Sequence, residues 1–129
     1  MRPLNFKKEI TGQLEPVVVK LTEALKKQGF GVLTRIDFHL KIKEKLNKDI
    51  PPTVVLGACN PQLAYDAFSV NTDMASLIPC NAVVREVGRG RYSVELVSPS
   101  ALMATMGDES LAMQAESADT ALKKVLSEI

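Results

Sequence analysis

The alternation of apolar and polar residues along the chain predicts a strand followed by a long helix. Asn5–Thr11 alternates polar residues with Phe6 and Ile10, as in a strand that buries one face. The apolar residues that follow fall on one helical face: Leu14, Val17, Val18, Leu21, Ala24 and Leu25. Pro16 is tolerated only in a first turn, and Gly29 is a natural C-terminal stop. A helix between these two signals is therefore expected.

The remaining pattern predicts four more strands with short helices between them. The strands are expected at Gly31–Phe38, Thr53–Cys59, Asn81–Val87 and Arg91–Val97. Short helices are expected at Leu40–Leu46, at Gln62–Phe68 and from Pro99 to Gly107. A last helix from about Glu109 has one apolar stripe, formed by Leu111, Ala115, Ala118, Leu122, Val125 and Ile129. The order β-α-β-β-β-β-α, with neighbouring strands and terminal helices, predicts one α+β domain (1–129) with a mainly antiparallel, helix-backed sheet.

Composition and charge narrow the classes of partner. The chain is 46% hydrophobic and 24% charged, which is typical of a globular domain. Sixteen basic and fifteen acidic residues leave a formal charge of +1, and Trp is absent, so nucleic-acid binding is disfavoured. No apolar run approaches the roughly 18 residues of a membrane span, so no membrane partner is expected. The N-terminus lacks the apolar segment of a secretion signal, which favours a cytoplasmic location.

Two short phrases place a Cys-Asn pair beside a proline at a strand boundary, namely Cys59-Asn60-Pro61 and Pro79-Cys80-Asn81. If the two strands run antiparallel, both pairs lie at the same edge of the sheet. Cys59 then precedes a helix N-terminus, where the positive end of the dipole favours a thiolate. The candidate ligand-binding residues are therefore Cys59, Asn60, Cys80 and Asn81. The competing interpretation is that the two thiols fill the core and that Asn60 only caps a helix.

Other chemically capable residues support weaker hypotheses. His39 is the only histidine, and two Cys with one His do not readily make a structural zinc site, so no metal residue is assigned. Met103 and Met106, together with the thiols, would suit a soft metal such as Cu(I), although methionine is commonly core filler. The lysines between Lys41 and Lys48 are expected to form a solvated face.

Three ordered phrases together resemble a known family: GFGVLTRIDF (Gly29–Phe38), VLGACNPQLAYDAF (Val55–Phe68) and IPCNAVVRE (Ile78–Glu86). The chain is similar to the family catalogued as domain of unknown function 302. The resemblance implies a curved antiparallel sheet backed by helices, like the architecture of the TATA-box-binding protein, and frequent pairing as a dimer. It implies no DNA binding, because fold does not carry function.

The sequence thus supports two main hypotheses of function. In the first, a binding domain takes a small sulfur-containing, redox or soft-metal ligand at the Cys59/Cys80 edge through thiol chemistry. In the second, a non-catalytic homodimeric domain has core cysteines, with Met113 and Leu126 flanking the last helical stripe as unpaired apolar area. A third hypothesis ranks well below them, namely nucleic-acid binding through the face from Lys41 to Lys48 and the hairpin arginines Arg85, Arg89 and Arg91. No cofactor is named, and turnover is left open.

Overall fold

Five antiparallel strands form one sheet in the computed structural model, which describes residues 2–129. The strands are β1 (Asn5–Thr11), β2 (Gly31–Asp37), β3 (Thr53–Cys59), β4 (Cys80–Gly88) and β5 (Arg91–Val97). Their order across the sheet is β1-β5-β4-β3-β2, so that β1 and β2 are the edges. This is the expected α+β fold, and the strand boundaries agree to within a residue with those expected from the sequence.

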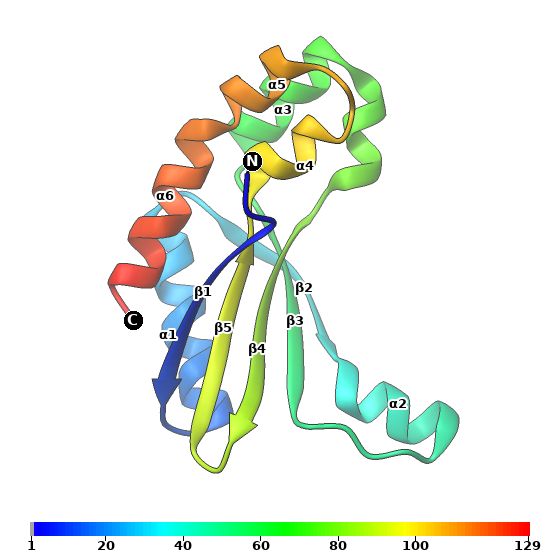
Figure 1. The fold of residues 1–129 in the computed structure, drawn as a ribbon, viewed down its shortest axis with the longest axis vertical. Coiled ribbons are helices and arrows are strands. Elements are labelled where there is room, and N and C mark those ends of the chain that lie inside the picture. Colours follow the sequence, from blue (N-terminus) through cyan, green and yellow to red (C-terminus); the bar gives the residue numbers. More distant parts are fainter. Residues whose placement is uncertain (1) are drawn as a thin grey trace.

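All helices but α2 (Phe38–Leu46) cover one face of the sheet or one of its ends, and α2 projects from the opposite end, where β2 leads into it (Figure 1). The other helical segments are α1 (Leu14–Lys27), α3 (Pro61–Val70), the 3-10 helix η1 (Thr72–Leu77), α4 (Pro99–Ala104), α5 (Glu109–Gln114) and α6 (Glu116–Ser127). The long helices α1 and α6 pack on the sheet, whereas α3, η1, α4 and α5 gather beyond the end where β3 stops and β4 starts. None of the helices in the described residues has the length and apolarity to cross a membrane.

The main core lies between the sheet and the pair α1 and α6. Leu21 and Leu25 of α1 and Val125 of α6 are fully buried against the inward residues of β3, β4 and β5. A second cluster of buried residues lies among the helices at the sheet end and consists of Met74, Met103, Leu111 and Ala112. The sequence predicted the first core from helical spacing, but not the second.

The last helix differs from the sequence-based prediction. The structure has two helices, α5 and α6, with Ala115 between them in place of one continuous helix from Glu109. Leu126 is buried in the main core at 8% exposure, while Met113 is 62% exposed on α5. The two residues therefore do not form one unpaired flank, and the argument for a dimer from this stripe is wrong.

Candidate functional site

The end of β3 and the start of β4 lie side by side in the sheet. Ala58 pairs with Cys80 in the antiparallel register, so Cys59 lies one position beyond that pair. Both Cys-Asn pairs therefore occupy the same end of the sheet, as the strand order predicted. The two thiols are free and partly buried.

The two thiols nevertheless lie on different faces of the sheet. Successive side chains of a strand alternate between faces, so Cys80 shares the helix-covered face with Ala82 and Val84, which are buried. Cys59 follows Ala58 and takes the opposite side.

Asn60 is fixed as the N-cap of α3. Its Oδ1 accepts a hydrogen bond from the Leu63 backbone N–H at 3.1 Å, and Pro61 occupies the first helical position. A Cβ on Gly29 would lie 3.0 Å from Asn60 Nδ2, so the glycine, with φ +85°, makes room for this amide. Asn81 is different, because it pairs with Gly57, is exposed and does not line the cavity described next.

A cavity of about 390 Å³ opens beyond the end of the sheet. Cys59, Asn60 and Cys80 line it from the strand ends, and α3, η1, α4, α5 and α6 provide most of its remaining wall. Most of the lining side chains are apolar. Asp66 is the single charged lining residue among those described, and no Lys, Arg or His lines the cavity.

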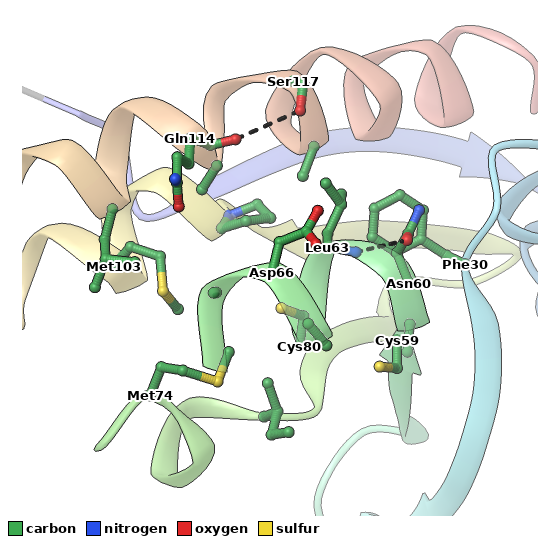
Figure 2. Close-up of a pocket in the computed structure, with 18 residues that line it drawn as sticks. Phe30, Cys59, Asn60, Leu63, Asp66, Met74, Cys80, Met103, Gln114 and Ser117 are labelled. Carbon is green, nitrogen blue, oxygen red and sulfur yellow. Dashed lines mark hydrogen bonds between the residues drawn. The ribbon is translucent and has the colours of Figure 1, made fainter. Parts of the chain in front are cut away.

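Sulfur atoms are concentrated in this cavity. Met74 comes from η1, Met103 from α4 and Cys80 from β4, and the two methionines are 2% and 4% exposed. Figure 2 shows the sulfur atoms of all three side chains facing the interior of the cavity. Met103 was a candidate from sequence, but Met74 was not, because no sequence signal predicted the 3-10 helix that carries it.

Cys80 is a neutral thiol at pH 7. Burial raises its pKa to about 11, and the charges of a Cys59 thiolate and of Asp119 act in the same direction. Because a neutral thiol is a weak nucleophile, the free Cys80 side chain is not expected to react as a thiolate at pH 7. Reactivity of Cys59 at neutral pH stays a prediction.

A polar cluster joins the two helices that flank the cavity. Asp119 of α6 accepts hydrogen bonds from Ser98 Oγ at 3.0 Å, from the Ser100 backbone N–H at 3.1 Å and from Ser100 Oγ. Both serines are 1% exposed. The carboxylate thereby holds the start of α4, including the cavity residue Pro99, against α6.

The other candidates from sequence have structural partners. His39 Nδ1 accepts the Thr53 backbone N–H at 2.9 Å, which ties α2 to β3. Two of the lysines on and after α2 form exposed ion pairs, Lys41 with Glu44 and Lys43 with Asp49. Within residues 2–129, no three His, Cys, Asp or Glu side chains are grouped so that they could hold a metal ion.

Comparisons with known proteins agree with the fold. A family model described as "Domain of unknown function DUF302" matches residues 6–129. A crystal structure of an uncharacterized conserved DUF302 protein from Bacillus stearothermophilus is similar to this chain, with a TM-score of 0.90 and 27% sequence identity over 98% of each chain. No curated protein matches.

Proposed function

Because this chain belongs to the family described as domain of unknown function DUF302, which names no activity, we propose its function from the cavity: it binds a small, soft ligand that is not an anion. The observation that carries the proposal is an apolar cavity with sulfur in its wall and no basic side chain in its lining. The cavity volume of about 390 Å³ falls in the range of small-molecule sites.

The lining chemistry defines the class of ligand. An anion would lose its hydration in this cavity without gaining a cationic partner, which is costly. Polarisable thioethers and a neutral thiol favour soft or apolar groups. Four polar side chains belong to the lining and are available to orient a ligand, namely Asn60, Asp66, Gln114 and Ser117.

The test uses a neutral fluorescent probe, N-phenyl-1-naphthylamine, whose emission rises in apolar sites. The unmodified protein should bind it saturably. Ala64→Phe, which adds volume to a lining residue of α3, should weaken binding by about tenfold, or about 1.4 kcal/mol. Ala75→Phe is the matched control, because Ala75 is exposed on η1 and does not line the cavity, and its affinity should equal that of the parent. Equal binding by the Ala64→Phe variant and the parent, or no binding by the parent, would contradict the proposal.

Self-association is a second candidate, and a different surface favours it. β2 is an edge strand with exposed Leu33 and Ile36, and α2 has no buried residue and exposes Phe38, Leu40 and Leu46. Unpaired edge strands and grouped apolar residues are typical of protein interfaces, and a two-fold pairing with a second copy would cover them.

Sedimentation equilibrium at micromolar concentration should give twice the chain mass of 14.1 kDa. Leu33→Lys should shift the species to the monomer, because a buried unpaired ammonium opposes pairing. Val19→Lys, at a similarly exposed residue of α1, should leave the dimer intact. A monomeric parent protein would refute the pairing. Equal dissociation of both variants would mean that the interface is not the surface of β2 and α2.

A further inference from the structure

We propose that the cavity binds one soft monovalent metal ion, Cu(I) or its analogue Ag(I), through the sulfur atoms of Cys80, Met74 and Met103. The inference rests on the proposed function, since it names the ligand class for the same cavity. Three observations support it: the positions of the three sulfur atoms, the lack of a group of other metal-binding side chains in the described residues, and the net charge of the complex.

The three sulfurs come from separate parts of the chain and meet in one cavity. Met74 lies on η1, Cys80 is the first residue of β4 and Met103 lies on α4. All three line the cavity. Their sulfur atoms face its interior (Figure 2). Both methionines are nearly completely buried, so packing restricts their side chains and lowers the ordering needed to bind a ligand.

The donor set selects the metal. Thiol and thioether sulfurs favour Cu(I), while carboxylate and water oxygens suit Mg²⁺ and Ca²⁺. The described residues contain no group of three His, Cys, Asp or Glu placed to hold a metal ion, so a site of hard or borderline ligands is absent there. Cys59 also lines the cavity, but it is not assigned as a ligand, because the strand pairing places it on the face of the sheet opposite Cys80.

Charge balance also favours a monovalent ion. On binding, the S–H bond of Cys80 breaks, a sulfur–metal bond forms, and the proton leaves to solvent. No electron is transferred. One thiolate and one monovalent cation leave a complex with no net charge, which an apolar cavity without basic residues accommodates. A divalent ion on the same ligands would leave a buried positive charge.

The experiment is an anaerobic competition for Cu(I) against bicinchoninate, followed by the colour of the chelator complex. The parent protein should remove one equivalent. Cys80→Ala and the double variant Met74→Leu/Met103→Leu should each weaken binding by about tenfold or more, since each removes ligating sulfur. Met→Leu conserves volume and costs less than about 1.5 kcal/mol of stability, so the folded cavity should persist. The matched control is Met113→Leu, at an exposed methionine that does not line the cavity, and it should keep the parent affinity.

A spectroscopic readout identifies the ligands directly. Ag(I) should shift the ε-methyl 13C resonances of Met74 and Met103 and leave that of Met113 in place. Failure of the parent to compete, or methionine resonances that do not move, overturns the three-sulfur site. Loss of affinity in Cys59→Ala with no loss in the methionine variant overturns it in favour of a dithiol site. If the neutral naphthylamine probe still binds in these cases, only the inference of a metal site is contradicted. If neither the probe nor the metal binds, the proposed function is contradicted as well.

Discussion

Gly57→Ala should destabilise the protein by about 2–3 kcal/mol, although it adds a single methyl group. A Cβ at Gly57 would lie 2.7 Å from Pro79 Cγ and closer still to Thr34 Oγ1. The ring of Pro79 is rigid, and the branched side chain of Thr34 has few rotamers, so neither yields without moving backbone. The strand β3 would have to shift just where it leads into Cys59 and the cavity.

Urea denaturation measures this effect, and Gly31→Ala is its matched control. Gly31 also lies in a strand, opposite Cys59, but a Cβ there meets nothing within 4 Å. Its replacement should be neutral or slightly stabilising, because alanine reduces the entropy of the unfolded chain. The double variant Thr34→Ala/Gly57→Ala should recover part of the loss. Equal stabilities for the Gly57→Ala and Gly31→Ala variants would mean that the structure accommodates the methyl group at Gly57 without loss of unfolding free energy.

Asp119→Ala should cost about 2–4 kcal/mol of unfolding free energy. The change removes the acceptor for Ser98 Oγ, Ser100 Oγ and the Ser100 backbone N–H, in a place where both serines are buried. The two hydroxyls lie 3.2 Å apart, so one can donate to the other, but the second hydroxyl and the Ser100 N–H are left without the acceptor that water provides in the unfolded chain. Because Asp119 joins α4 to α6, the cavity should also bind the naphthylamine probe more weakly.

The same cluster supplies the controls for this prediction. Asp119→Asn keeps one acceptor oxygen and the side-chain volume, so it should lose less unfolding free energy than Asp119→Ala. The double variant Ser100→Ala/Asp119→Ala removes the Ser100 hydroxyl together with its acceptor. Its loss of unfolding free energy should therefore be less than the sum of the losses in the two single variants. Asp49→Ala, at an exposed carboxylate, should change stability by less than about 0.5 kcal/mol. Additive losses within the cluster would mean that the three side chains act independently.

Local signals in the sequence account for much of the fold. Alternating apolar residues located β1, a continuous apolar and β-branched run located β3, and helical spacing located α1. The signals Asn60-Pro61 and Ser98-Pro99 marked the starts of α3 and α4, where Asn60 Oδ1 and Ser98 Oγ accept backbone N–H groups of the first turn.

The parts of the site that sequence did not predict depend on contacts between distant segments. The faces on which Cys59 and Cys80 lie follow from the pairing of Ala58 with Cys80, and a shift of one residue would reverse them. Met74 lies on a 3-10 helix too short to have a period of its own. The division of the last helix at Ala115 follows from packing of α5 in the second cluster and α6 in the main core. The sequence therefore predicted that both Cys-Asn pairs lie at one end of the sheet, but it predicted neither the position of Met74 nor the cavity.

The presence of two separate buried clusters has a consequence for how a ligand reaches the cavity. Among residues 2–129, four buried residues form the cluster beside the cavity, against eighteen in the main core. Cooperative units with fewer buried apolar contacts open at lower free energy than the whole protein. We therefore expect η1, α4 and α5 to open as a sub-global unit while the sheet, α1 and α6 stay folded. A ligand would then enter the cavity when these helices open, and a bound ligand would shift the equilibrium to the closed state. Binding would therefore appear chiefly as slower amide hydrogen exchange in these three helices.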